Sequence, residues 1–292
     1  MNRRALVAVT VLLLSAGCTP KSGSLGPAPT GSPISPTPGA SASSSPQPAP
    51  ASSSPQPGPA SSKPVGSVTV SLWFTHAGKI AYTKRTRPAT ASTSRLALSE
   101  LAAGPTVLEA SAGLSTGFPS GTTFAIAGIS GGVETVSFSA GFYAGGRDAV
   151  RLRQAQVVYT LTQFSSVSKV AFQSDGQALA APVGRADYAD LLPAIVVTSP
   201  IIGQRAGSPV TVAGTANVYE ATVSIRILDS AGRAVATTFT TATCGSGCRG
   251  SYSVRVSYRV SREQAGIVEV YQVSAQDGSD RDVVRIPVIL LP

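Results

Sequence analysis

The sequence predicts three parts in order: a disordered amino-terminal tether, an α+β domain and an all-β sandwich. A stretch rich in Ser, Pro and Ala, without aromatic residues, follows the first 18 residues. Hydrophobic residues then alternate between strand-like and helix-like spacing up to about residue 182, and strand-like runs alone follow from about residue 193. The 292-residue chain is long enough for two ordinary domains after the tether.

Residues 1–17 have the features of an export signal that ends at a lipidation site. Two arginines near the start are followed by an apolar stretch from Ala5 to Leu14, which is too short to span a bilayer, and by small residues before Cys18. This segment resembles a bacterial lipoprotein signal peptide, although Ser15 departs from its commonest pattern. The resemblance implies cleavage before Cys18 and a diacylglyceryl group on its thiol. An ordinary secretory signal with a chance cysteine is the alternative.

A lipid on Cys18 would place the protein outside the cytoplasm, on the outer face of the cell membrane. Two acyl chains give stable anchoring, whereas one binds only marginally. Residues 18–66 then form the tether, because a stretch made almost entirely of Ser, Pro, Ala, Gly and Thr cannot bury a core. A nine-residue unit that begins at Ser43 occurs again from Ser52 with one residue changed. Such a repeat indicates a tether in which amino-acid composition matters more than the exact order of residues. We expect a spacer that holds the folded domains away from the lipid.

Residues 67–182 show the pattern of an α+β domain with helices on one face of a sheet. Five segments have the alternation of strands: Val68–Phe74, Lys79–Lys84, Thr123–Ile129, Val133–Phe138 and Val167–Phe172. One helix is predicted from Arg95 to Ala103, with Ser94 as its N-cap and Gly104-Pro105 as its stop. A second helix is predicted to begin near Arg147.

The second predicted helix has an apolar face and a polar face. The apolar positions lie along one side and are Val150, Val157, Leu161 and Phe164, with Val158 beside them. The polar positions lie opposite and are Arg153, Gln156, Thr160 and Gln163. This spacing is typical of an amphipathic helix that packs on a core through one face.

Residues 193–292 carry strand patterns alone. The strand-like segments are Ile195–Thr198, Val210–Ala213, Val223–Leu228, Ala234–Thr240, Tyr252–Tyr258, Ile267–Val273 and Val283–Leu290. Seven short strands in about 100 residues, separated by turn residues, favour a β-sandwich. The Cys and Trp pattern of antibody domains is absent, because the single tryptophan, Trp73, lies in the first domain.

Both domains resemble known families. Segments of the first domain resemble, in order, the blocks of the GerMN family of bacterial sporulation and germination proteins: Leu98–Thr106, Gly117–Thr122, Val133–Ser139 and Ala155–Phe164. The second domain resembles the immunoglobulin-like domain of bacterial spore-germination proteins, on segments that include Val197–Pro200, Pro209–Ala216 and Ser274–Ser279. The first resemblance implies a protein-interaction role without established catalytic residues. The second implies an immunoglobulin-like sandwich.

Cysteine usage fits an exported protein. With Cys18 assigned to lipid, Cys244 and Cys248 remain in a short glycine-rich stretch between two strands. In an oxidising compartment these two are expected to form a disulfide. A metal site or free thiols are the alternatives, but a metal would need further ligands, and the single histidine, His76, lies far away at a predicted hairpin turn.

The sequence nominates no catalytic residue, no cofactor and no metal site. His76 has no partner motif, and neither a Gly-x-Ser-x-Gly elbow nor a glycine-rich phosphate loop occurs. Asp277, Asp280 and Asp282 form an acidic cluster, which we interpret as a solvated turn rather than a calcium site. Glu220 is expected to be half-buried and hydrogen-bonded within the sandwich.

The formal net charge of +9 falls to +7 when the two arginines of the signal are removed, 9 minus 2. The clearest basic run is Lys79, Lys84, Arg85 and Arg87. It is a weak candidate for binding an anionic wall polymer, and an exposed hairpin edge that keeps the protein soluble is the alternative. Export argues against nucleic acid as a partner.

These observations predict a non-catalytic interaction or scaffold module of the cell envelope, not an enzyme. We expect another envelope protein as its partner and a connection to sporulation, germination or envelope signalling. A receptor for a cell-wall polymer or a small ligand is the alternative function.

Overall fold

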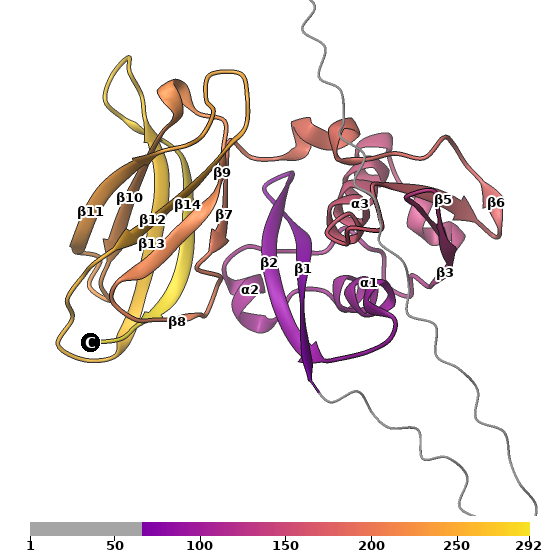
Figure 1. Ribbon diagram of the computed structural model, residues 1–292, viewed down its shortest axis with the longest axis horizontal. Helices are drawn as coiled ribbons and strands as arrows, with labels where there is room; N and C mark the ends of the chain where they lie inside the picture. The colour runs from indigo at the N-terminus through magenta and orange to yellow at the C-terminus, as the bar shows by residue number, and fades with distance from the viewer. Residues whose placement is uncertain (1–65) are drawn as a thin grey trace, which may run out of the picture. The chain divides into compact units, whose positions relative to one another are not determined.

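The computed structural model describes residues 66–292 (Figure 1). The predicted signal over residues 1–17, the lipidation site Cys18 and the predicted tether up to residue 65 lie outside the described residues. Within the described part, no helix is long and apolar enough to cross a membrane.

The first domain begins with an isolated hairpin. β1 (Ser67–His76) pairs antiparallel with β2 (Lys79–Pro88), and each strand is longer than the sequence predicts. Ala77 and Gly78 form the turn with φ values of 47° and 76°, a conformation that glycine adopts without strain. Every second residue of β1 from Val70 to Phe74 is fully buried, so the hairpin has one face on the core.

A four-stranded sheet forms the other side of this domain. Its strands are β3 (Phe124–Ser130), β4 (Val133–Phe138), β5 (Lys169–Ser174) and β6 (Gln177–Ala178). They lie in the order β3-β4-β5-β6. β4 and β5 are parallel, and the chain between them contains the crossover helix α3. The sequence did not predict β6.

The helices of this domain are α1 (Thr93–Ala103), α2 (Val107–Ser111), α3 (Arg147–Leu161) and the short 3-10 helices η1 (Ala140–Tyr143) and η2 (Arg185–Leu191). The prediction of Ser94 as the N-cap of α1 is wrong. The cap position is Ser92, whose side chain makes no capping hydrogen bond, and Ser94 lies in the first turn, where its hydroxyl donates to Glu134 Oε2 at 3.2 Å. Gly104 ends α1 with φ 83°.

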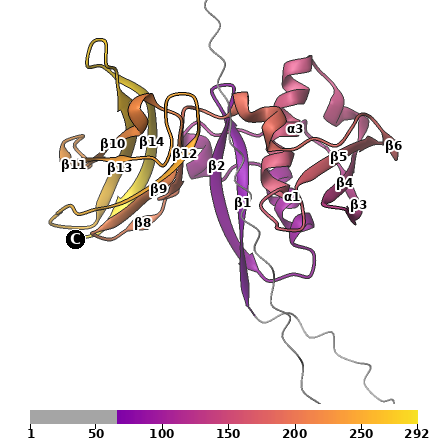
Figure 2. The ribbon, with the colours of Figure 1, turned by 45° about the horizontal axis from the view of Figure 1, so that its top comes forward.

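α1 and α3 lie between the hairpin and the four-stranded sheet, as Figures 1 and 2 both show. The sequence predicts helices on one face of a single sheet, and it misses that the hairpin forms a separate layer on their other side. α3 is therefore buried all around, from Ala155 to Leu161 without a break. One hydrophobic cluster joins hairpin, helices and sheet.

The polar face of α3 is buried as well, so the prediction of a helix with one buried face needs correction. Gln156 and Thr160 are fully buried and Arg153 is 8% exposed. Thr160 Oγ1 accepts from the Trp73 backbone N–H at 3.2 Å, and Gln156 Nε2 donates to the Trp73 carbonyl at 3.1 Å. Gln163 pairs in the same way with both backbone groups of Ser71, at 2.7 and 2.8 Å. These side chains form hydrogen bonds with the backbone N–H and C=O groups at the edge of β1, as the backbone of a neighbouring strand would.

The second domain is an all-β sandwich, and this confirms the predicted fold class. Its strands are β7 (Ile195–Ser199), β8 (Arg205–Ala206), β9 (Val210–Ala216), β10 (Thr222–Leu228), β11 (Ala234–Thr241), β12 (Gly250–Val256), β13 (Gln264–Val273) and β14 (Asp280–Leu290). One sheet has the order β11-β10-β13-β14-β8 and the other β12-β9-β7. All seven predicted strands are present, and the two-residue β8 was not predicted. Ile225, Ile227 and Val268 are among the fully buried residues between the sheets.

Candidate functional site

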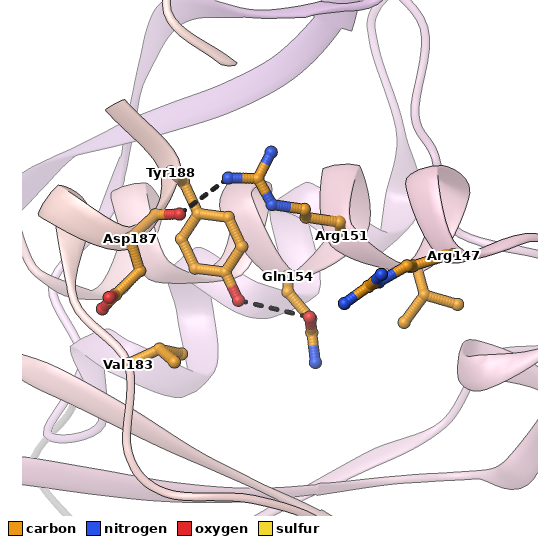
Figure 3. Close-up of a pocket in the computed structure, with 7 residues that line it drawn as sticks. Arg147, Arg151, Gln154, Val183, Asp187 and Tyr188 are labelled. Atoms are coloured by element: carbon orange, nitrogen blue, oxygen red, sulfur yellow. Dashed lines mark hydrogen bonds between the residues drawn. The ribbon is translucent and has the colours of Figure 1, made fainter. Parts of the chain in front are cut away.

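An open cavity of about 420 Å³ lies beside the first two turns of α3 in the first domain (Figure 3). After β6 the chain returns to α3 and forms η2. The cavity is bounded by α3, by η2 and by Val183, which lies just before η2. Its lining combines charged, amide and apolar side chains: Arg147, Val150, Arg151, Gln154, Val183, Asp187 and Tyr188. The sequence predicts no regular structure for the η2 segment.

Arg151 fixes η2 on α3. Its guanidinium donates to both carboxylate oxygens of Asp190, at 2.6 and 2.7 Å, and to the Asp187 carbonyl at 2.8 Å. It also lies over the Tyr188 ring, 5.5 Å from the centroid. The hydrogen bonds from Arg151 hold the pKa of the Asp190 carboxyl below its usual value. Both side chains are well exposed, so the pair orients the segment more than it stabilises the fold.

Tyr188 forms the floor of the cavity. Its ring is buried, and its hydroxyl donates to Gln154 Oε1 at 3.2 Å. Burial raises the pKa of Tyr188 to about 12. At neutral pH the phenol is therefore a hydrogen-bonding group and cannot act as a base.

Arg147 is the exposed cation of this site. It is the first residue of α3, and no ion pair engages it within residues 66–292. Val150 and Val183 line the same cavity, and Figure 3 shows Val183 across the cavity from Arg147. A guanidinium on a helix that lines a partly apolar cavity can hold a carboxylate or a carbonyl of a bound segment, while an apolar side chain of that segment packs on the cavity wall.

The basic run of the hairpin is not a free charged surface. The expectation of exposure is wrong for Arg85, whose side chain is 8% exposed and contacts Glu100 at 2.9 Å and Glu109 at 2.6 Å. Arg87 is half-exposed and pairs with Glu100 at 2.6 Å. Lys79 is exposed and donates to the Asp190 carbonyl at 2.7 Å, whereas Lys84 is half-exposed. The four residues therefore do not form one basic patch.

Glu109 is the centre of a buried polar network. Its carboxylate accepts from Arg85, from Thr83 Oγ1 at 2.8 Å and from the Thr106 backbone N–H at 2.7 Å, while Thr106 Oγ1 accepts from the Glu109 N–H at 3.3 Å. Burial opposes ionisation of this carboxyl, but the hydrogen bonds from Thr106 and Arg85 outweigh it and lower the pKa of Glu109. The network is structural, and the Thr-x-x-Glu spacing at 106–109 is the sequence signal that would have revealed it.

Cys244 and Cys248 are joined by a disulfide, with 5.7 Å between their Cα atoms. The small loop that it closes is held on the preceding turn: the Ser246 N–H donates to the Val218 carbonyl at 2.9 Å, and the Gly247 N–H donates to Asn217 Oδ1 at 3.0 Å. The loop is therefore docked on the sandwich and not free.

The remaining candidates from the sequence lie apart from the cavity. His76 is exposed at the end of β1, where Nδ1 is 3.0 Å from the Gly113 carbonyl oxygen. Glu220 was expected to be half-buried, but it is exposed, in a left-handed turn with φ 50°. Asp280 pairs with Arg226 at 3.0 Å. Among residues 66–292, no three His, Cys, Asp or Glu side chains gather as a metal site.

The sequence did not identify the carboxyl of Glu134 as unusual. Glu134 alternates with Val136 and Phe138 on the core side of β4 and is fully buried. Its Oε2 accepts from Ser94, and its Oε1 has no hydrogen-bond partner among the described residues. Burial raises the pKa of Glu134. The strict alternation of strand β4 was the available signal, because it places position 134 inward.

Comparisons with known families match both domains. Residues 71–180 match the family described as sporulation and spore germination. Residues 194–279 match the immunoglobulin-like domain of bacterial spore germination. A comparison with curated proteins found no match.

Two solved structures from Bacillus subtilis are similar in part. The tandem GerMN domains of the sporulation protein GerM align with 77% of this chain and 61% of that one, at 16% identity and a TM-score of 0.38. This chain thus spans less than two thirds of that structure. The first GerMN domain of GerM aligns with 40% of this chain and 95% of that one, at 25% identity and a TM-score of 0.35.

Proposed function

We propose that this chain, which carries a sporulation and spore germination domain followed by an immunoglobulin-like domain of bacterial spore germination, is a non-catalytic interaction module of the cell envelope. The pairing of these two domain types is the observation that carries the proposal. The module recognises another envelope protein in a process of sporulation, germination or envelope signalling.

The proposed place of work is the outer face of the cell membrane. The support is the sequence before residue 67, whose first residues have the pattern of an export signal that ends at Cys18 and are followed by a stretch rich in Ser, Pro and Ala. The disulfide between Cys244 and Cys248 fits the same compartment, because disulfides persist in oxidising spaces.

The proposed contact surface is the cavity between α3 and η2. Arg147 supplies an exposed guanidinium, and Val150 and Val183 supply apolar area in the same cavity. Tyr188 and Arg151 are fixed by their own partners, so the surface is rigid before it is occupied. A rigid site loses little entropy on binding. A partner segment with a carboxylate or carbonyl next to an apolar side chain fits this chemistry.

Photo-crosslinking in intact cells tests this proposal. A photoreactive residue at position 147 is expected to give an adduct with an extracytoplasmic protein. The matched control carries the same residue at position 86, where Thr86 is exposed on β2. Adducts of equal yield and identity at both positions, or none at position 147, would refute the surface. Adducts with cytoplasmic proteins alone would refute the proposal that the chain works in the cell envelope.

A receptor for anionic wall polymer has less support than a protein-interaction module. Its proposed cations were Lys79, Lys84, Arg85 and Arg87. Arg85 and Arg87 are engaged with Glu100, which leaves little free charge on this hairpin for a polyanion.

A further inference from the structure

A second cavity, of about 500 Å³, lies at the amino terminus of α1 and is distinct from the surface proposed for protein contact. Its lining comes from three parts of the first domain. The start of α1 contributes Ser92, Thr93 and Ser94, the β3–β4 hairpin contributes Ile126, Ile129 and Glu134, and the segment after α3 contributes Phe164 and two serines. Polar and apolar groups thus meet at one place.

The amino terminus of α1 presents unused hydrogen-bond donors to this cavity. α1 has 11 residues, and its first free N–H groups belong to Thr93, Ser94 and Arg95. The Ser92 side chain does not cap them, and the first turn contains no acidic residue. Within residues 66–292, the hydrogen bonds that the structure contains leave these N–H groups without an acceptor. The positive end of the helix dipole adds to their potential.

Glu134 supplies the second, independent observation. Its side chain is fully buried and forms part of the cavity lining. Its Oε2 accepts from Ser94, whereas its Oε1 has no partner among the described residues. A buried acceptor without a donor is costly for the fold. Its persistence in the wall of a cavity is explained if a ligand brings the missing donor.

The charges around the cavity select a neutral ligand. The free N–H groups of the α1 terminus and the positive end of its dipole disfavour an ammonium group. Glu134 disfavours a carboxylate or phosphate, because like charges repel at short range. A neutral group with a donor and an acceptor side by side satisfies both sides of the site. Ile126, Ile129 and Phe164 add an apolar wall.

We propose that this cavity binds a neutral N-acetylated amino sugar. The acetamido N–H donates to Glu134, its carbonyl accepts from the free N–H groups of α1, and its methyl group packs on the apolar wall. The serine hydroxyls at the rim bind ring hydroxyls. This activity goes beyond the proposed protein contact, and it uses different residues.

Titration of the purified full-length chain with three trisaccharides tests the proposal. We expect binding of the fully N-acetylated chitin trimer, with amide shifts at residues 92–95 and 126–129. The unacetylated, cationic trimer and the neutral glucose trimer lack the acetamido group and should bind roughly tenfold or more weakly. Equal affinity for all three sugars, or no binding at millimolar sugar, would overturn the proposal.

Two variants and a matched control locate the site. Glu134→Leu removes the acceptor and should weaken binding roughly tenfold. Ile129 is 45% exposed, so Ile129→Ser leaves the fold intact and should weaken binding about threefold. Leu179→Ser changes a similarly exposed residue outside the cavity, at 48%, and should have no effect. If both site variants bind like the unaltered chain, the cavity is not the sugar site, whatever becomes of crosslinking at position 147.

Discussion

Arg85 is a single residue that is buried although its neighbours in the sequence are polar. Its neighbours along β2 are Lys84, Thr86 and Arg87, which together read as an exposed edge. Its partners Glu100 and Glu109 lie 15 and 24 residues away. The fold brings them together on the buried side of the hairpin, where the charges compensate one another.

Removing one partner of this network should destabilise the first domain strongly. Glu109→Gln leaves the Arg85 guanidinium buried with weaker compensation, and a loss of about 3–5 kcal/mol in the free energy of unfolding is expected for breaking such a pair. Chemical denaturation measures it. The double variant Arg85→Leu with Glu109→Leu is the control, because it removes both charges and should lose less than the single variant. A single variant as stable as the unaltered chain would contradict the role of the pair.

Acid should weaken the same network. The pKa of Glu109 in the folded chain lies below the ordinary value of 4.5, so its contribution is complete above pH 4.5. That contribution is lost as the pH falls from 4.5 through the folded pKa. The Glu109→Gln variant should show a flatter stability profile in this window. Parallel profiles for the two proteins in denaturation series would contradict the assignment.

Glu134 should behave in the opposite way. Burial raises its pKa above 4.5 in the folded chain, so ionisation costs stability once the pH exceeds 4.5, and this loss grows until the pH passes the folded pKa. Glu134→Gln removes the ionisation and should stabilise the fold at neutral pH, with no gain below pH 4.5. Thermal unfolding of both proteins across this range measures the difference. A variant that is less stable at neutral pH would show that the carboxylate is needed.

At the scale of elements, α3 acts as a substitute for a strand beside β1. Thr160→Val keeps the shape of the side chain but leaves the Trp73 N–H unpaired. A loss of about 1–3 kcal/mol is expected for a buried donor without a partner, together with faster hydrogen exchange at position 73. Gln154→Leu on the same helix is the control, because Gln154 bonds only the Tyr188 hydroxyl at a half-exposed position. Equal effects of the two substitutions would contradict the edge-satisfying role of Thr160.

The disulfide loop should contribute modestly to the second domain. Closing a five-residue loop limits the unfolded chain little, so replacing both Cys244 and Cys248 by Ser should lower stability by about 2 kcal/mol. The docking bond from Ser246 to the Val218 carbonyl should persist. Protection of the Ser246 amide in hydrogen exchange checks this, and a lost signal would show that the disulfide alone holds the loop.

At the scale of the whole molecule, the sequence predicts strands and their order well, because alternation along a strand is a local signal. It predicts the sandwich from the same signal, and it predicts the two long helices from apolar residues spaced three to four positions apart, which is also a local signal. It misses the second layer over α3 and the burial of Gln156, because both depend on residues more than 80 positions away. The cavity beside Tyr188 was also missed, since η2 has no periodic pattern. Family resemblance identifies the two domains without locating their surfaces.

We propose that the folded part is an interaction module presented at the outer face of a membrane. If Cys18 carries the lipid, Cys18→Ser should abolish incorporation of a labelled fatty acid into the protein, because a serine at position 18 has no thiol for the diacylglyceryl group. Metabolic labelling followed by immunoprecipitation measures the change. A variant labelled as strongly as the unaltered chain would contradict the assignment of Cys18 as the lipid attachment site.

The mass of the mature amino-terminal peptide, isolated from native cells, decides whether the chain is anchored through lipid. We expect a peptide that begins at Cys18 and carries the added mass of a diacylglyceryl group. A peptide that retains Met1, or an unacylated protein in the cytosol, would contradict it.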